Sequence, residues 1–204
     1  MKLILLAPPG GGKGVVSEKL VRDFGFQYIS MGELLRDEVK KETEIGKKIK
    51  EVIERGDLVP DHFTVEIIRL VVKGKNHYIL DGFPRTLHQA KDIKDIPIDK
   101  VIYLDVSEND VVERISGRRI CEKGEHIYHI KFIRPKQNGI CDVDGTKLIQ
   151  RNDDQEEIVR NRLKIYKEKT KPLIEFYIQK GLLIKINGSK KPEEVYEAVK
   201  KAVE

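Results

Sequence analysis

The sequence of 204 residues predicts an α/β fold, a five-stranded parallel sheet flanked by helices on both faces. Three observations predict this fold class. Five short apolar runs, typical of buried strands, alternate with segments of helical periodicity. The first run ends in a glycine-rich turn that opens a helix. Residues 30–59 and 119–150 interrupt the alternation, and they predict a helical insertion and a small β-rich lid.

The elements can be justified in chain order from their patterns. Strands are predicted where nearly every residue is apolar, at residues 3–6, 27–29, 78–81, 101–105 and 182–186. Helices are predicted where apolar residues recur at spacings of three and four, at residues 15–24, 30–40, 44–55, 61–73, 86–93 and 108–118. A long helix then runs through Val159 and Tyr177, and Pro172 should bend it. Pro192 opens the last helix, which Lys200 and Lys201 close.

The two interruptions define the expected domain boundaries. Residues 30–59 form two short helices where a plain crossover needs one, and insertions at the carboxyl end of a strand tend to bind ligands. In residues 119–150 the helical periodicity stops, Ile127 to Phe132 alternates as a strand would, and turn signals follow. This segment is too small to fold alone and should act as a lid. The core then comprises residues 1–29, 60–118 and 151–204.

The composition of the chain limits the kinds of molecule that it is expected to bind. The chain is 39% apolar and 36% charged, with a net charge of +5 and an isoelectric point near 9.0. Acidic residues are interspersed and no aromatic-rich basic stripe occurs, so a positive cleft for small polyanions is favoured over nucleic acid. No stretch approaches ~18 apolar residues and no signal peptide precedes Met1, which leads us to expect a cytoplasmic protein without a membrane partner.

The glycine-rich turn predicts a phosphate cradle. Residues without a Cβ let backbone N–H groups close around an anion at the helix start, and Lys13 adds a positive charge. A strict P-loop has glycine where Ala7 stands and a hydroxyl residue where Gly14 stands. Without that hydroxyl, Mg²⁺ must be held by carboxylates further along or by water and phosphate. A strand-to-helix turn without a ligand is the weaker interpretation of this composition.

Charged residues further along point to the same chemistry. Asp81 ends the third strand, where such folds anchor Mg²⁺ through water; the alternative is a turn or capping aspartate. Arg114, Arg118 and Arg119 lie within six residues. A solvated charge run is the usual explanation, but Arg151 and Arg162 suggest that basic groups converge on something anionic.

Six sequence blocks, in order and spacing, resemble adenylate kinases. They are Pro9-Gly10-x-Gly12-Lys13-Gly14, Ile29-Ser30-x-Gly32-Glu33, Gly56-Asp57-Leu58-Val59-Pro60-Asp61, Asp81-Gly82-Phe83-Pro84-Arg85-Thr86-x-x-Gln89-Ala90, Gly117-Arg118-Arg119 and Gln150-Arg151-x-Asp153-Asp154. The resemblance covers essentially the whole chain. It implies a P-loop kinase fold in which residues 30–59 bind the nucleoside monophosphate and residues 119–150 form the long lid typical of bacterial enzymes. It also implies a monomer that catalyses reversible Mg²⁺-dependent transfer, ATP plus AMP giving two ADP, for adenine nucleotide homeostasis.

The resemblance implies roles by position. The implied catalytic residues are Lys13, Arg85, Arg118, Arg151 and Arg162. ATP would contact Gly10, Gly11, Gly12, Lys13, Gly14, Val15, Arg114, Arg118, Tyr128 and Lys190. AMP would contact Met31, Arg36, Asp57, Leu58, Val59, Gly82, Arg85, Gln89, Arg151 and Arg162. Within these sets, Arg36 and Arg85 would bind the AMP phosphate and Gln89 its adenine. Arg114 would lie over the ATP adenine, and Asp81 would order the Mg²⁺ waters.

Four positions depart from the family pattern. Ala7 replaces the usual glycine, and Val15 with Val16 replaces the usual Thr-Gln. Backbone amides do most of the work of the loop, so Ala7 and Val15 are tolerated where φ is negative. Met31 replaces a threonine near AMP and removes a hydroxyl, so we expect an active enzyme with altered AMP affinity.

The lid carries three of the four ligands that zinc-containing members have. Cys121, Cys141 and Asp144 fit ligand positions, whereas Gly124 stands at the fourth. His126 or His129 could complete a zinc site. Two other interpretations stay open at this point: two buried thiols in a metal-free lid, or a disulfide, which a hyperthermophilic host would permit.

Two competing functions stay open on the sequence. A UMP/CMP-type kinase shares the fold, but Thr86 and Gln89 favour adenine and the full-length lid favours the adenylate enzyme. A nucleotide-binding protein with impaired catalysis is conceivable from the altered loop. The basic residues retained at the implied catalytic positions count against this interpretation, because a protein that only binds a nucleotide does not need to surround its γ-phosphate.

Overall fold

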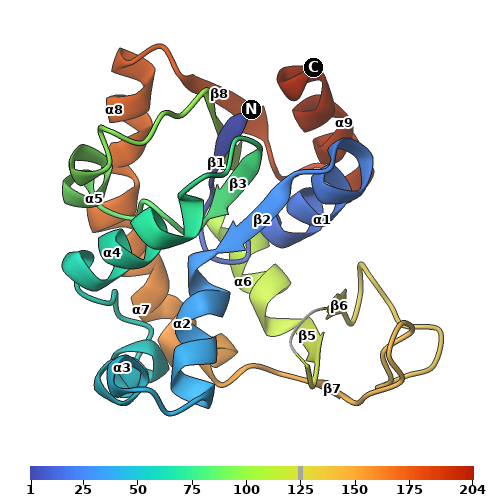
Figure 1. The fold of residues 1–204 in the computed structure, drawn as a ribbon. Helices are drawn as coiled ribbons and strands as arrows, with labels where there is room; N and C mark the ends of the chain where they lie inside the picture. The colour runs from blue at the N-terminus through green and yellow to red at the C-terminus, as the bar shows by residue number, and fades with distance from the viewer. Residues whose placement is uncertain (124–125) are drawn as a thin grey trace.

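The computed structural model describes residues 1–123 and 126–204 and contains the predicted parallel sheet (Figure 1). The strand order is β2-β3-β1-β4-β8, and every neighbouring pair is parallel. The strands are β1 (Lys2–Leu6), β2 (Gln27–Ser30), β3 (Tyr78–Asp81), β4 (Lys100–Asp105) and β8 (Leu183–Asn187). The fold class predicted from the sequence is confirmed.

Helices cover both faces of this sheet because successive strand residues point to opposite sides. Leu3 and Leu5 of β1 pack into one apolar cluster, with α1 (Lys13–Phe24), α6 (Glu108–Ser116), α7 (Glu156–Ile165) and α9 (Pro192–Val203). Ile4 and Leu6 point into the other cluster, with α4 (Asp61–Val72), α5 (Leu87–Asp92) and α8 (Pro172–Gln179). Both halves of the core therefore meet at the strand that leads into the glycine-rich loop.

The helical insertion follows β2. It consists of α2 (Met31–Lys40) and α3 (Glu44–Glu54), and each helix begins at a side-chain cap. The Ser30 hydroxyl accepts a hydrogen bond from the Glu33 N–H, and the Thr43 hydroxyl accepts one from the Gly46 N–H at 3.0 Å. The two helices pack closely where Gly46 of α3 meets the end of α2.

The lid carries a separate antiparallel sheet in the order β6-β5-β7. Its strands are β5 (Arg118–Cys121), β6 (Ile127–His129) and β7 (Leu148–Ile149), and Figure 1 shows them beside the core on the side of α6. The predicted strand through Phe132 was too long. It ends at His129 because Nδ1 of that ring accepts hydrogen bonds from the Lys131 and Phe132 N–H groups at 3.0 and 3.2 Å, which turns the chain.

Two helix predictions also need correction. The helix expected to reach residue 118 ends at Ser116, and Arg118 opens β5 instead. The long helix that follows the lid is interrupted, after a 3₁₀ turn (Asn152–Asp154), by a π-helical turn, η2 (Tyr166–Thr170), between α7 and α8. Pro172 has no N–H for the regular ladder, and the Lys171 N–H bonds to the Tyr166 carbonyl five residues back at 2.8 Å.

No helix in the described part of the chain is long and apolar enough to cross a bilayer.

The close packing of α2 on α3 can be tested at Gly46. A Cβ there would lie 2.0 Å from the carbonyl oxygen of Glu38, a backbone atom that cannot rotate away. We expect Gly46→Ala to lower the free energy of unfolding by about 2 kcal/mol, measured by urea denaturation. Lys50→Ala, an exposed change on the same helix, is the control and should leave stability unchanged. Equal stability of the two variants would contradict the close approach.

Candidate active site

The loop after β1 forms a cradle at the start of α1. Gly10 and Gly12 adopt φ values of 69° and 87°, a left-handed backbone that side chains rarely tolerate. A Cβ on Gly10 would also lie 2.4 Å from Cγ1 of Ile115, so the loop packs directly on α6. Among the described residues that are not glycine, only Glu42 has positive φ, so the condition under which Ala7 and Val15 are tolerated is met.

Lys13 projects from the first turn of α1 toward the end of β3. Its Nζ lies 3.4 Å from the carbonyl oxygen of Ala7 and 3.8 Å from Oδ1 of Asp81. The other oxygen of Asp81 accepts a hydrogen bond from the Tyr28 hydroxyl at 2.7 Å. Burial lowers the pKa of Lys13, while burial and the nearby Asp81 raise the pKa of Tyr28. Tyr28 is therefore a neutral donor that holds the carboxylate beside the lysine.

Two arginines are held by two consecutive aspartates. Arg118 makes a two-point ion pair with Asp154, which has no exposed side-chain surface; its Nε donates to Oδ2 at 2.8 Å. Arg162 donates to the backbone and side-chain oxygens of Asp153 at 3.0 and 2.9 Å. Burial works against the charge of Arg118, but the Asp154 carboxylate outweighs it and raises the pKa. At Arg162 burial outweighs Asp153 and lowers the pKa, so the carboxylates offset the burial of Arg118 fully and that of Arg162 only in part.

Arg151 and Arg85 lack such compensation. Burial and neighbouring arginines lower the pKa of each to about 10. Arg85 donates to the Gly82 carbonyl at 2.8 Å, whereas Nε of Arg151, although buried, has no hydrogen-bond partner among the described residues. A buried, charged donor without a partner is unfavourable in isolation and is satisfied by an anion.

The predicted binding residues line two neighbouring cavities that share Arg36. The larger, of about 470 Å³, is lined by all the residues implied for ATP: Gly10, Gly11, Gly12, Lys13, Gly14, Val15, Arg114, Arg118, Tyr128 and Lys190. Its other lining residues include Asp81, Arg36 and Arg151. The smaller is lined by residues implied for AMP: Met31, Arg36, Asp57, Leu58, Val59, Gly82, Arg85, Gln89 and Arg162. Arg151, implied for AMP, lines the larger cavity.

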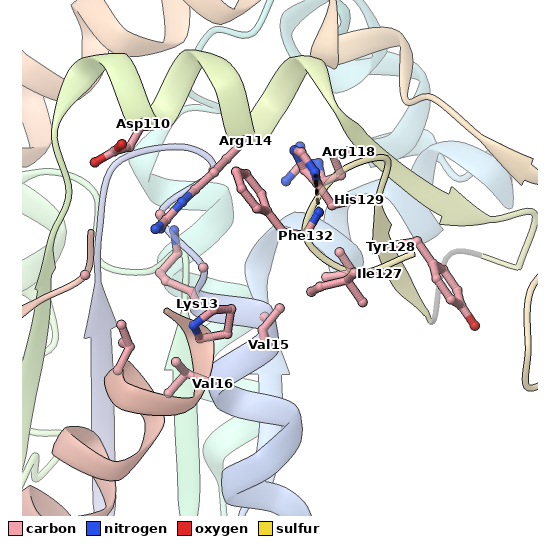
Figure 2. Close-up of a pocket in the computed structure, with 18 of the residues that line it drawn as sticks. Lys13, Val15, Val16, Asp110, Arg114, Arg118, Ile127, Tyr128, His129 and Phe132 are labelled. Carbon is pink, nitrogen blue, oxygen red and sulfur yellow. Dashed lines mark hydrogen bonds between the residues drawn. The ribbon is translucent and has the colours of Figure 1, made fainter. Parts of the chain in front are cut away.

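Figure 2 shows the larger cavity with α6 running above it. Arg114 extends from this helix over the loop toward Lys13, and its NH1 lies 3.8 Å from the point that a Cβ on Gly12 would occupy. Val15, Ile127 and Phe132 give the cavity an apolar part, suited to a flat ring system. The cavity therefore combines a cationic end at the loop with an apolar end under the lid.

The polar groups of two side chains, Arg119 and Tyr128, point away from where the sequence led us to expect them. Arg119 does not join the cationic group, since its NH1 donates to the carbonyl oxygens of Ser116 and Arg118 at 3.2 and 2.7 Å. The Tyr128 ring lines the larger cavity, but its hydroxyl accepts from the Asp142 N–H at 2.7 Å inside the lid.

Residues of the insertion and of the core contact one another beside the smaller cavity. Met31 is only 2% exposed and belongs to the apolar core. Asp57 accepts a hydrogen bond from Asn161 Nδ2 at 2.9 Å, and the same nitrogen donates to the Arg55 carbonyl. Asn161 lies on α7 beside Arg162, so the position of the insertion is coupled to an arginine of the site.

The lid contains a four-residue cluster that could hold a metal ion. One ligand atom each of Cys121, His126, Cys141 and Asp144 lies within 4.8 Å of all the others. His126 fills the gap in the predicted set, whereas the ring nitrogens of His129 are engaged by backbone groups. Gly124 lies outside the described residues. Both cysteines are described and carry free thiols, so the disulfide interpretation is wrong for this structure.

Several site residues escaped prediction because their partners are distant in sequence. Tyr28 faces Asp81, 53 residues away, and Asn161 faces Asp57, 104 residues away. Only the register of β2 and β3, which pairs Ser30 with Asp81, could have suggested the first contact. Asp153 and Asp154 stood in a recognised motif, yet nothing in it assigned them to particular arginines.

The Arg118–Asp154 pair gives a test of buried charge. Removing the carboxylate leaves a buried guanidinium among other cations, so Asp154→Ala should lower the free energy of unfolding by about 3 kcal/mol. Glu156→Ala is the matched control, because Glu156 pairs with Arg160 at the surface, where the side chains are 72% and 73% exposed. It should not measurably change the urea midpoint, and similar losses in both variants would contradict the assignment.

Comparison with known proteins agrees with this geometry. A family model described as adenylate kinase matches residues 5–182. An adenylate kinase of Oceanobacillus iheyensis is 44% identical, with 100% of this chain and 99% of the relative aligned. Adenylate kinases of Caldicellulosiruptor saccharolyticus and Methanosarcina barkeri are 44% and 43% identical, over 100% and 98% of this chain and 99% and 97% of the relatives.

The loop, the paired cavities and the similarity along the whole length agree with the resemblance read from the sequence motifs. The chain belongs to the adenylate kinase family.

Proposed function

We propose that the two cavities bind the two nucleotides of the adenylate kinase reaction, in which ATP and AMP give two ADP. One observation carries this proposal: basic side chains from four separate parts of the chain gather around the adjoining cavities. They are Lys13, Arg85, Arg118, Arg151 and Arg162. The phosphate groups of ATP and AMP, meeting end to end, would supply negative charge to balance these cations.

Phosphoryl transfer requires alignment and charge neutralisation more than covalent chemistry. The backbone of residues 10–15 and Lys13 would hold the ATP phosphates, while Arg114 and Lys190 border its adenine. Arg118, Arg151 and Arg162 would surround the transferred phosphoryl group. Asp153 and Asp154 fix two of these guanidinium groups before substrate arrives, so little reorganisation is needed during transfer.

The smaller cavity would hold AMP. Arg36 and Arg85 bind its phosphate in this proposal, and Gln89 binds its adenine beside Met31 and the backbone of residues 57–59. The buried Met31 adds apolar surface where the family has a hydroxyl, which supports our expectation of altered AMP affinity. Residues 30–59 then act as the monophosphate-binding insertion and residues 119–150 as the lid, with the remainder as core.

The family uses Mg²⁺ with ATP, and the residues present fit a weakly protein-bound ion. Gly14 offers no hydroxyl, but the Asp81 carboxylate faces the larger cavity beside Lys13. Asp81 would hold the ion through water, and the phosphates would supply the remaining ligands. When bound, Mg²⁺ neutralises charge on the phosphate oxygens.

The lid cluster fits structural zinc. The two sulfur atoms lie 3.5 and 3.4 Å from Nδ1 of His126, and Oδ2 of Asp144 lies 3.4 Å from it. Ligand atoms around tetrahedral zinc are separated by about 3.5 Å, given metal–ligand bonds of about 2.0–2.3 Å. Oδ2 of Asp144 is buried without a hydrogen-bond partner in the described residues, as expected of a ligand atom. These observations favour zinc over a metal-free lid.

A UMP/CMP-type kinase is the second candidate on the same fold. The relatives named adenylate kinase and the buried Gln89 favour AMP as the acceptor. A catalytically impaired nucleotide-binding protein would not need four buried or half-buried arginines around the phosphates. The monomeric state and the cytoplasmic location remain predictions.

A coupled assay with ATP and each of AMP, CMP and UMP tests the function. We expect AMP to be the preferred acceptor by at least about 100-fold in kcat/KM, because a buried hydrogen-bonding site rejects mismatched bases. No turnover with AMP together with phosphorylation of another monophosphate would overturn the proposal.

A substitution of Arg151 can distinguish a role in catalysis from a role in stability. Because its charge is poorly compensated, Arg151→Ala should lower kcat about 100-fold while leaving the melting temperature unchanged or raised. Arg160→Ala, an exposed arginine on α7, is the control and should preserve both quantities. A clear loss of stability in Arg151→Ala, with kcat preserved, would contradict the assigned role.

Metal analysis tests the lid. The purified protein should contain about one zinc per chain, and chelation should lower the melting temperature because the metal binds only the folded state. His126→Ala and Cys141→Ser should abolish zinc binding, whereas His129→Gln should retain it. Zinc-free protein with two titratable thiols, even after incubation with zinc, would instead support the metal-free lid.

A further inference from the structure

The side chain of Gln89 is held by a network of hydrogen bonds that its sequence motif does not predict. It is 2% exposed and lines the smaller cavity. Its Nε2 donates to Oδ1 of Asp61 at 2.7 Å and to the Thr64 hydroxyl at 3.1 Å. Its Oε1 accepts from the backbone N–H of Arg85 at 2.6 Å. Both ends of the carboxamide are therefore bound by the protein.

The partners leave one orientation for this carboxamide. A backbone N–H can only donate and an ionised carboxylate can only accept, so Oε1 must face Arg85 and Nε2 must face Asp61. The Thr64 hydroxyl donates its own proton to the Asp61 carbonyl at 2.9 Å and can offer Nε2 only a lone pair. A flipped amide would set two donors against each other at Arg85 and two acceptors at Asp61.

Asp61 is itself fixed at the start of α4. Its Oδ2 accepts from the Thr86 hydroxyl at 2.9 Å and lies 3.3 Å from Nδ1 of His88. Thr86 in turn caps α5 by accepting the Gln89 N–H. The orientation of the side chain is thus determined by the junction of two helices.

The hydrogen-bonding capacity that the Gln89 carboxamide has left determines which group of a ligand it can recognise. Nε2 has two protons, and both are donated to protein groups, whereas Oε1 has two lone pairs and only one is used. An acceptor is therefore the free group of this side chain. It matches the exocyclic amine at position 6 of adenine and opposes the oxygen at position 6 of hypoxanthine or guanine.

We propose that Asp61, with Thr64, is a positioning residue for base selection: it fixes the Gln89 carboxamide so that its oxygen faces the base, which selects 6-amino over 6-oxo purine monophosphates. This inference rests on the proposed function, because it assumes that the smaller cavity binds the acceptor nucleotide. It assigns selection to residues outside the implied binding set.

The experiment compares AMP with inosine monophosphate, which differs at position 6 and at the protonation of N1. Both kcat/KM with ATP and the dissociation constants from calorimetry are measured, and each is expressed as an AMP-to-IMP ratio. The wild-type ratio should be at least about 100. Asp61→Ala frees the amide and should lower the ratio about tenfold, and Thr64→Val frees one N–H and should lower it about threefold.

Two variants control for charge and helix stability. Asp61→Asn keeps an oxygen for Nε2, and the Arg85 N–H still orients the amide, so the ratio should stay within about threefold of wild type. Asp92→Ala removes the other carboxylate on His88, 3.1 Å from Nδ1, without touching the Gln89 side chain, and should leave the ratio unchanged. A merely structural role would weaken both nucleotides equally.

Unchanged ratios in Asp61→Ala and Thr64→Val would overturn the inference, as would equal losses in Asp61→Ala and Asp92→Ala. If Asp61→Ala does not fold, the Thr64→Val ratio decides the matter alone. Failure of the wild-type protein to phosphorylate AMP is a separate result that overturns the proposed function. Normal AMP turnover with an unchanged ratio overturns only the role of Asp61.

Discussion

The arrangement of the molecule depends on holding several positively charged side chains together in largely buried positions. Guanidinium and ammonium groups repel one another there, and burial alone disfavours their charge. Asp153 and Asp154 neutralise Arg162 and Arg118 and fix their geometry. Lys13, Arg85, Arg151 and Arg162 nevertheless keep a lowered pKa, and Nε of Arg151 finds no hydrogen-bond partner in the described part of the chain. This electrostatic imbalance is one that the phosphates of the proposed substrates would relieve.

The parallel sheet makes this concentration of charge possible. Parallel strands bring their carboxyl ends to one edge, so the glycine-rich loop after β1 and Asp81 at the end of β3 become neighbours. The helices on both faces of the sheet hold this edge in place. Successive residues of β1 pack into the two apolar clusters on opposite faces. A rigid base of this kind is what allows long arginine side chains to converge with fixed geometry.

The two inserted segments complete the site from opposite sides. The insertion contacts α7 through Asp57 and Asn161, and α7 also carries Arg162. The lid reaches the larger cavity through Ile127 and Phe132, and its sheet begins at Arg118. Each segment is thus linked, covalently or by hydrogen bonds, to an arginine that lines one of the two cavities. Closure of the lid or the insertion over a nucleotide would shift these charges as well as exclude water.

The sequence alone determined the strand–helix alternation and the glycine-rich loop, and every residue that it implied for a nucleotide lines one of the two cavities. These features are local, because apolar periodicity and short motifs depend on the backbone conformation of neighbouring residues. It could not determine where the lid strand ends, because His129 turns the chain through its own ring nitrogen, nor that Pro172 follows a π-helical turn.

Only the tertiary structure decided which polar groups pair. His126 instead of His129 completes the lid cluster, Tyr28 holds Asp81, Arg119 turns away from the cationic group, and Asp61 with Thr64 orients Gln89. These contacts join residues whose separation in the chain follows no period. They exist because buried donors and acceptors must each find a partner in three dimensions, and the packed fold alone fixes which partners are within reach.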